Sequence, residues 1–484
     1  MRTHQELAGL IWSVADLLRG DYKQSEYGRV ILPLTLLRRL APSADLGAFI
    51  VGDDPIAREV IDLYDFDRQI ERLDRAGLLA PLLDRFAGLD LSADAVDNHQ
   101  MGYVFEALIR RFSEISNETA GEHFTPREVV RLMVDLVVDH DGDEPISIYD
   151  PACGTGGMLS AASDRLRTVA PHATVRLYGQ ELNPESYAIC RSDLLLRGQE
   201  PANVVLGNSL SDDGHRGRTF HYMLANPPFG VEWKKVGDAV RAEAALGHAG
   251  RFGAGLPRIN DGSLLFLQHM LAKMRPVAAG GSRLGIVFNG SPLMTGGAGS
   301  GESEIRRWIL ENDLLEGVVG LPEQLFYNTA IPTYIWILSN RASTGQVTLL
   351  DARDRWTRMP RSLGNKRRFL ADEQIARITA DYRAAAGDGV TVVPARDFGY
   401  RRISVNGRPM SVPLDQDVDA YVEREVRPYV PDAAIDHGRT RIGYEIPFTR
   451  IFHSYAPPRP LDEIDAEIRA LQTRIEALLG DVQR

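Results

Sequence analysis

Apolar residues recur at helical spacing through the first quarter of the chain. From Leu7 to Leu18 they stand three or four residues apart, which places them on one face of a helix. A second run, Val30–Leu40, carries Pro33 near its start, where the first turn of a helix tolerates proline. Similar periodicity continues over 56–89 and 103–113. The pattern predicts an all-α N-terminal domain over residues 1–116.

From about residue 117 short β-rich runs alternate with amphipathic helical stretches. Alternation of this kind predicts parallel βαβ units. The segment 321–333 between the last two runs is too short for a crossover helix, so those two strands should form an antiparallel hairpin. We therefore expect an α/β domain at 117–430 with a doubly wound, seven-stranded, mostly parallel sheet. The predicted strands are 146–149, 174–179, 203–206, 222–225, 284–288, 317–320 and 334–338, and the clearest helices between them are 158–168, 184–197, 263–274 and 302–312.

Three further segments stand apart from this alternation. In the C-terminal tail, 431–484, apolar residues from Leu461 to Leu478 follow a heptad over nearly three repeats, which predicts a helix that docks on the core or pairs with another chain. The glycine- and serine-rich segment 290–303 should be a mobile loop. Segment 341–370 carries eight basic and two acidic residues, typical of a solvated face or of a strip that faces a phosphate backbone.

Composition narrows the class of protein. Of the 484 residues 44% are hydrophobic and 25% are charged, as in ordinary globular proteins. The two cysteines suit a reducing compartment, and without a long apolar run or a signal peptide we expect a cytoplasmic protein with no membrane partner. The net charge of −11 disfavours independent binding of nucleic acid, unless another subunit supplies most phosphate contacts.

The clearest motif is ISIYDPACGTGG, at residues 146–157, where a strand ending in Asp150 meets a glycine-rich turn and a helix start. Glycines let the backbone approach a ligand, and the helix start offers free N–H groups to a carboxylate. Because Leu159 stands where the dinucleotide fingerprint requires glycine, a pyrophosphate site is not predicted. A plain strand-to-helix connection is the alternative, but Asp150 repels phosphates and can accept a hydrogen bond from an ammonium group.

Two polar residues follow the next strands. Glu181 ends the second strand, where a carboxylate can accept both hydroxyls of a ribose; the alternative is a surface carboxylate. Asn208 follows the third strand, where its amide could meet an adenine edge. Together with the glycine turn, these residues predict a nucleoside-containing ligand.

The second decisive motif is YMLANPPF, at residues 222–229. Prolines lack N–H donors, so Asn226 Oδ1 and the Pro227 carbonyl can accept both hydrogens of one exocyclic amine. Such acceptance raises the electron density on the amine nitrogen and directs its lone pair toward an electrophile. Phe229 offers a face on which a planar base can stack. A turn with a buried aromatic ring is the alternative.

These motifs resemble those of a known family. DPACGTGG followed by NPPF is similar to amino-methyltransferases that use S-adenosylmethionine (AdoMet), and GEHFTPREVVRLMV, at 121–134, looks like the segment that precedes the glycine turn in N6-adenine DNA methyltransferases of the gamma class. Segments 11–40, 317–338 and 443–452 resemble the methyltransferase (M) subunits of Type I restriction–modification systems. The resemblance covers nearly the whole chain and implies a class I AdoMet-dependent methyltransferase fold, Rossmann-like, with AdoMet as cofactor.

The resemblance also implies roles for individual residues. Phe124, Thr125 and Pro126 would pack against the methionine end of AdoMet, and Asp150 would meet its ammonium group. Glu181 would hold the ribose, and Asn208, where related enzymes often carry an acid, would hold the adenine with Leu210. The catalytic set is Asn226, Pro227, Pro228 and Phe229, and the full cofactor set is Glu122, His123, Phe124, Thr125, Pro126, Asp150, Pro151, Gly154, Thr155, Gly156, Gly157, Glu181, Asn208 and Leu210.

The implied function is site-specific transfer of a methyl group to the N6 amine of a flipped DNA adenine. A specificity (S) subunit would read the sequence, with a second copy of the M subunit and, in systems that restrict DNA, a restriction (R) subunit in the complex; the 461–478 helix is a candidate coupling element. The sequence has no H-E-x-x-H and no paired C-x-x-C, so no metal is expected. Two alternatives are an RNA or protein-glutamine N-methyltransferase and a non-catalytic scaffold of a defence complex.

Overall fold

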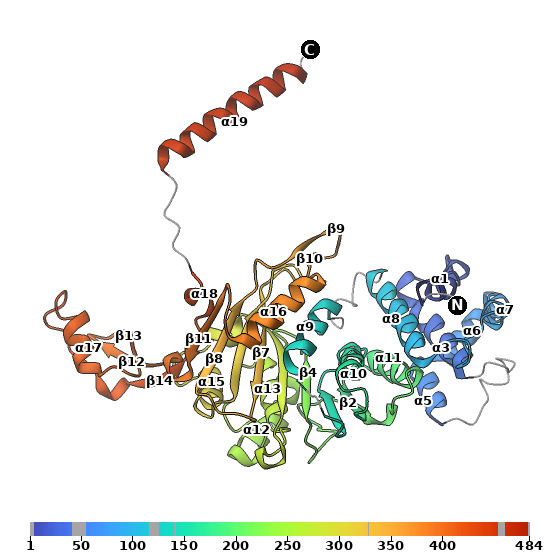
Figure 1. The fold of residues 1–484 in the computed structure, drawn as a ribbon, viewed down its shortest axis with the longest axis horizontal. Helices are drawn as coiled ribbons and strands as arrows, with labels where there is room; N and C mark the ends of the chain where they lie inside the picture. The colour runs from blue at the N-terminus through green and yellow to red at the C-terminus, as the bar shows by residue number, and fades with distance from the viewer. Residues whose placement is uncertain are drawn as a thin grey trace. The chain divides into compact units, whose positions relative to one another are not determined.

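The N-terminal part of the chain is helical. In a computed structural model, the described residues are 4–40, 55–115, 125–139, 142–327, 329–453 and 460–482. They divide into two compact units, residues 1–446 and 447–484. The first unit begins with α1 (His4–Trp12), α2 (Ala15–Leu18), α3 (Gly28–Leu40), α5 (Pro55–Leu63), α6 (Phe66–Arg75), α7 (Leu79–Ala87) and α8 (Asn98–Ile115), as Figure 1 shows. We call α1 to α8 the helical module.

The helical module buries the apolar residues that the spacing predicted. Ile11, Leu37 and Phe105 have no exposed surface and belong to one hydrophobic core. The sequence predicted Pro33 in the first turn of its helix, and this prediction is wrong. The helix α3 begins at Gly28, so the proline falls in the second turn. No helix among the described residues is both long and apolar enough to cross a membrane.

A nine-stranded sheet follows. All seven predicted strands form: β1 (Ile146–Asp150), β2 (Val175–Glu181), β3 (Val204–Leu206), β4 (Tyr222–Ala225), β5 (Arg283–Asn289), β6 (Leu315–Gly320) and β7 (Thr333–Ser339). The spatial order is β11-β8-β6-β7-β5-β4-β1-β2-β3. Neighbours from β5 to β3 run parallel, whereas β7 is antiparallel to both β5 and β6. The predicted doubly wound sheet and its terminal antiparallel hairpin are confirmed.

The sheet has two strands more than expected. β8 (Gln346–Asp351) adds parallel to β6, and β11 (Val390–Pro394) adds antiparallel to β8. The strand β8 buries Val347, Leu349 and Leu350 within the segment that the sequence presented chiefly as basic. The rest of that segment forms a separate two-stranded sheet, β9 (Thr357–Leu363) with β10 (Lys366–Phe369).

Helices pack on the sheet and connect its strands. They are α9 (Arg127–Val137), α10 (Gly157–Val169), α11 (Pro184–Leu196), α12 (Gly237–Ala244), α13 (Ser263–Leu271), α14 (Ser291–Met294), α15 (Gly301–Glu311) and α16 (Asp372–Ala384). The helix α9 packs on β5 between α10 and α16 (Figure 1). Segment 290–303 is not a plain loop, because it contains α14 and the first turn of α15, and buried Arg306 donates hydrogen bonds to the carbonyls of Pro292, Thr295 and Gly296.

Beyond β11 the chain forms smaller elements. A three-stranded sheet joins β12 (Gly399–Val405), β13 (Arg408–Pro413) and β14 (Arg441–Tyr444), with α17 (Val418–Glu425) between them. The second unit contains α18 (Phe448–Ile451) and α19 (Leu461–Val482). The predicted C-terminal helix is thus present, and Leu461, Ile468, Leu471 and Ile475 on its heptad positions are exposed.

The helix α11 belongs to two cores at once. Cys190 and Leu194 pack in the core under the sheet, whereas Ala188 and Leu196 pack in the core of the helical module. Arg197, which follows α11, forms ion pairs with Asp193 of α11 at 2.9 Å and with Glu106 of α8 at 3.7 Å. The helical module is therefore packed onto the nine-stranded sheet through this helix.

We expect truncation of Leu196 to weaken the whole first unit. Leu196 is 1% exposed, so Leu196→Ala should lower the free energy of unfolding by roughly 2–5 kcal/mol through lost burial and a cavity. Denaturant titration followed by circular dichroism measures the change. Leu246→Ala, at a side chain that is 62% exposed, is the control and should change it by less than about 1 kcal/mol. Equal effects of both variants would contradict the shared core.

Candidate active site

A large cavity lies at the carboxyl ends of the central strands. Its volume is about 1630 Å³, and its wall includes residues that follow β1, β2, β3 and β4. The strand β1 pairs with β2 on one side and β4 on the other, so the strand order reverses at this point. Ligands of doubly wound α/β proteins bind in the crevice at such a reversal. Sites for single small ligands usually measure about 300–1,000 Å³, so this cavity has room for more than one group.

The glycine turn brings backbone N–H groups to this cavity. Gly154 and Gly156 adopt φ of +54° and +86°, a region that favours glycine. A Cβ atom on Gly156 would stand 2.9 Å from Cys190 Sγ, so no larger residue fits. The turn leads directly into α10 at Gly157, whose first N–H groups have no partner within the helix. The turn is thus built for close approach of a ligand to the backbone.

Two carboxylates are buried beside the turn. Glu181, 7% exposed, accepts hydrogen bonds from the Gly154 N–H at 2.8 Å and the Asn183 N–H at 2.7 Å. Asp150, 2% exposed, accepts one from the Ala152 N–H at 3.0 Å. Burial raises the pKa of Asp150 to about 8, and the nearby Glu181 charge acts in the same direction. The pair therefore favours a cation in the cavity, since a positive charge would stabilise ionised Asp150.

Asn226 presents an acceptor without a partner. Its Nδ2 donates to Thr125 Oγ1 at 2.9 Å, which orients the amide. Its Oδ1 is buried and has no hydrogen-bond partner within the described part of the chain. A buried polar atom of this kind costs roughly 1–3 kcal/mol unless a ligand satisfies it. Thr125, Asn226, Pro228 and Phe229 all line the cavity. The site is thus complementary to a hydrogen-bond donor next to an aromatic face.

The structure brings most of the predicted residues to the cavity. Besides those four, the lining includes Asp150, Pro151, Gly154, Thr155, Gly157, Glu181, Asn208 and Leu210. Pro126, Gly156 and Pro227 are buried or adjacent and do not line it. The Oδ1 of Asn208 accepts a hydrogen bond from the Leu210 N–H at 2.9 Å, which leaves its amide NH₂ for other contacts. Glu122, His123 and Phe124 lie outside the described residues.

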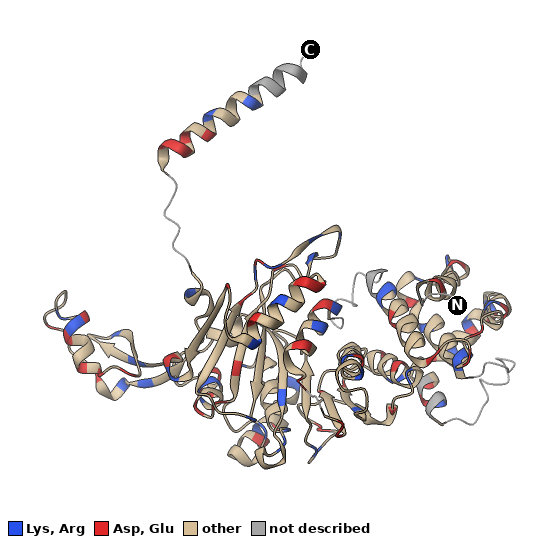
Figure 2. Cartoon of the chain, in the orientation of Figure 1, with Lys and Arg blue, Asp and Glu red and all other residues tan. Residues whose placement is uncertain are grey.

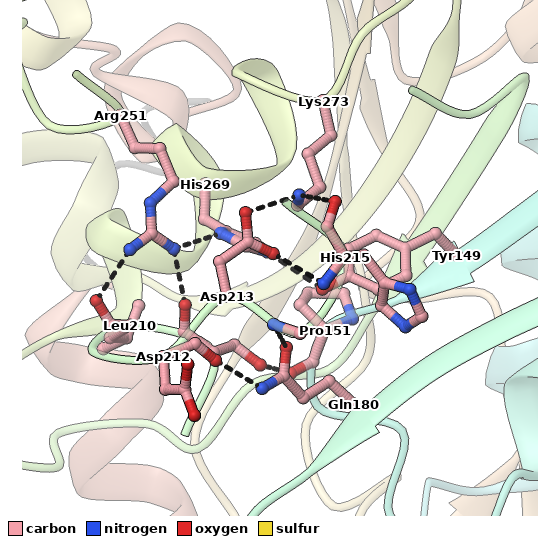
Figure 3. Close-up of polar contacts among 12 residues, drawn as sticks. Tyr149, Pro151, Gln180, Leu210, Asp212, Asp213, His215, Arg251, His269 and Lys273 are labelled. Atoms are coloured by element: carbon pink, nitrogen blue, oxygen red, sulfur yellow. Dashed lines mark hydrogen bonds and ion pairs between the residues drawn. The ribbon is translucent and has the colours of Figure 1, made fainter. Parts of the chain in front are cut away.

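Sequence reasoning missed a buried polar network behind the loop that follows β3. Arg251 donates to the Ser209 and Leu210 carbonyls at 2.6 and 3.0 Å and to His269 Nδ1 at 2.8 Å (Figure 3). Lys273 Nζ binds Asp213 Oδ2 at 2.8 Å and the His215 carbonyl at 2.9 Å. These donors hold the loop from behind, so Asn208 and Leu210 face the cavity from a fixed backbone.

The tautomer of His269 follows from its partners. Arg251 can only donate, so Nδ1 accepts and Nε2 carries the proton toward the Tyr149 hydroxyl, 2.9 Å away. Burial lowers the pKa of His269 well below its usual range, and the charges of Arg251 and Lys273 act the same way. No sequence motif marks these residues, because they come from separated segments that only the fold joins. The aromatic side chains of Trp233 and Phe266 also line the cavity and were not predicted.

Comparison with known proteins places the fold and then the family. The structure is similar to a Type I restriction–modification methyltransferase subunit from Streptococcus thermophilus (TM-score 0.64, 20% identity, 81% of this chain and 96% of the other) and to a putative class I S-adenosylmethionine-dependent methyltransferase from Listeria monocytogenes (TM-score 0.52, 15% identity, 78% and 97%). The fold is that of class I AdoMet-dependent methyltransferases. The family model for N-6 DNA methylases matches residues 96–396, and that for the HsdM N-terminal domain matches residues 7–45. The chain belongs to the N-6 DNA methylase family.

Curated relatives share part of their length with the chain. The Type I restriction enzyme MjaIX methylase subunit of Methanocaldococcus jannaschii is 28% identical over 62% of this chain and 52% of its own. The HindI methylase subunit of Haemophilus influenzae is 31% identical over 57% and 59%. The chain spans about half the length of the curated relatives that it matches.

We expect Asp150→Asn to stabilise the isolated chain in a pH-dependent way. Asp150 has a folded pKa of about 8 and an ordinary unfolded value near 3.9, so wild-type stability falls as pH rises from about 4 to about 8. The variant lacks this loss and should be more stable by up to about 5 kcal/mol at pH 8, with little difference at pH 4. Urea titrations at both pH values measure it. An equal difference at pH 4 and pH 8 would contradict the raised pKa.

Proposed function

We propose that the chain is a site-specific N6-adenine DNA methyltransferase subunit that uses AdoMet. The observation that carries the proposal is the buried Oδ1 of Asn226, which has no hydrogen-bond partner among the described residues; Thr125 orients the amide, and Asn226 lines the same cavity as a cation-favouring carboxylate. Membership of the N-6 DNA methylase family supports the same reading. The site thus combines an acceptor for an amine with a pocket for a cationic cofactor.

The chain's residues fit AdoMet in four respects. Asp150 would hold the ammonium group, and the glycine turn with the start of α10 would receive the carboxylate. Glu181 would bind the ribose hydroxyls with its remaining lone pairs, and Asn208 and Leu210 would border the adenine. When bound, AdoMet supplies a methyl group activated by its sulfonium.

Asn226 would act on the target amine. Its Oδ1 and the Pro227 carbonyl would each accept one amine hydrogen and so direct the nitrogen lone pair at the methyl group. Phe229 would stack on the base, which must leave the duplex at a cost of a few kcal/mol, roughly. The surplus proton would pass to solvent after transfer, so no further base is required.

We expect Asn226→Ala to abolish methyl transfer but retain AdoMet binding. Loss of the acceptor should lower kcat for DNA by about 100-fold or more, because the interaction acts on the reacting amine. Thr125→Val keeps the shape of the side chain but removes the Asn226 partner, and should lower kcat by about tenfold. Tritium transfer from labelled AdoMet to DNA measures both, with calorimetry for binding.

Asn203→Ala is the matched control, since Asn203 stands outside the cavity and should leave both measurements unchanged. Unchanged methylation by Asn226→Ala would favour the non-catalytic scaffold over the enzyme. Parallel assays on RNA and on protein distinguish the proposed substrate from the two other methyl acceptors.

We also propose that recognition of the DNA sequence comes from partners. The net charge of −11 leaves the chain poorly suited to bind DNA tightly by itself. A specificity subunit would supply that function, together with a second M copy and, where restriction occurs, an R subunit. The exposed heptad positions of α19, Leu461, Ile468 and Leu471, are the candidate coupling surface.

The purified chain alone should therefore bind AdoMet yet methylate DNA slowly. Addition of the specificity subunit should raise the rate by about 100-fold or more, because the partner holds the target against the site. Single-turnover methylation with and without that subunit measures the ratio, and Leu471→Asp should reduce it without a change in AdoMet affinity. Robust site-specific methylation by the chain alone would contradict the proposal.

A further inference from the structure

The β9–β10 hairpin is a basic element in an acidic protein. Residues 357–369 contain Arg358, Arg361, Lys366, Arg367 and Arg368 and no acidic residue. Figure 2 shows this hairpin in blue and tan, whereas acidic residues are frequent elsewhere. The side chains of Arg358, Arg361 and Arg367 are exposed. An uncompensated cluster of arginines on an exposed hairpin indicates an anionic partner.

The strand register places two of these charges opposite each other. Arg358 pairs with Arg368 across the hairpin, and the Arg368 guanidinium lies 4.0 Å from the Trp356 ring centroid. Like charges directly opposite on an antiparallel pair are destabilising. An anion between them would remove the repulsion. The hairpin thus carries an electrostatic cost that binding would offset.

The base of the hairpin is fixed to the wall of the cavity. Lys366 is 3% exposed, forms an ion pair with Glu128 of α9, and donates to the Leu325 carbonyl at 2.8 Å. The chain then enters α16, whose Asp372 forms an ion pair with Arg131 of α9 at 2.7 Å. Glu128, Arg131 and Asp372 all line the cavity. In Figure 1 the hairpin extends past the sheet next to α16.

We infer that the β9–β10 hairpin binds the phosphate backbone of the duplex from which the target base is extruded. The inference rests on the proposed function and adds a contact surface to it. Arg358, Arg361, Arg367 and Arg368 are the phosphate-binding residues, and buried Lys366 is the anchor that ties the hairpin to Glu128 in the cavity wall. Arginine pairs well with phosphate because its planar guanidinium donates two parallel hydrogen bonds. These contacts position the duplex and carry no base specificity.

The test is the salt dependence of duplex binding by the full chain. Each neutralised phosphate contributes about −0.9 to the slope of log K against log salt concentration, so Arg361→Gln with Arg367→Gln should make the slope shallower by about 1.8. Fluorescence anisotropy with a labelled duplex of about 30 base pairs, over roughly 25–200 mM salt, measures it. AdoMet affinity should stay unchanged, because neither residue lines the cavity.

A matched control removes two charges near the amino-terminal end of the central strand β1. Arg176 and Arg218 are exposed and lie beside the first residues of β1, away from its carboxyl end. Arg176→Gln with Arg218→Gln changes net charge equally and should leave the slope unchanged. Arg358→Gln gives a second readout: it should raise the thermal unfolding midpoint by relieving repulsion while it weakens duplex binding.

Slopes that are equal for the wild type and the hairpin variant, or that change as much in the control, would overturn the inference. So would the absence of duplex binding by the wild type at low salt. Methyl transfer by the wild-type complex separates the two proposals. If it methylates DNA while the hairpin variant binds normally, only the hairpin assignment fails; if it does not methylate DNA, the proposed function fails.

Discussion

Two neighbouring buried carboxyl groups determine both the shape of the glycine turn and the charge that the cavity favours. Asp150 and Glu181 end neighbouring parallel strands, so the sheet itself brings them together. Glu181 is satisfied by two backbone N–H groups, one of which belongs to the glycine turn. Among the described residues Asp150 accepts a hydrogen bond from one such donor, and burial leaves it protonated near neutral pH. Glu181 thus holds the glycine turn in shape. Asp150 stays available to a cation, whose charge would stabilise its ionised form.

A similar division of labour holds on the other wall. Thr125 accepts a hydrogen bond from the Asn226 Nδ2, whereas Asn226 Oδ1 has no partner within the described ranges. Behind the β3 loop, Arg251 and Lys273 satisfy backbone carbonyls that would otherwise be buried without donors. In each case a neighbouring side chain fixes the position of atoms at the cavity wall. The desolvation cost of burying these polar groups is offset only when their hydrogen bonds form, which requires the native geometry.

The sequence predicted the sheet and the motifs better than it predicted their supports. Strands β1 and β4 were clear because each is a short apolar run that ends in a polar motif, and Asp150 and Asn226 are named by those motifs. The strand β8 was missed because its surroundings are basic, and charge masked its apolar alternation. Pro33 was misplaced by half a turn or more, since element boundaries depend on capping that periodicity does not encode. Arg251, His269 and Lys273 could not be found, because tertiary folding alone brings them together.

The dual packing of α11 has a mechanical consequence. Its first residue, Pro184, follows Glu181 by three positions, and its far end is enclosed by the helices of the N-terminal module. A rotation of that module would therefore move α11 as well. Because the Asn183 N–H before α11 donates to Glu181, the movement would also shift the Glu181 carboxylate at the end of β2. A molecule that bound the N-terminal helices and rotated them would therefore change the position of Glu181 without direct contact with the cavity.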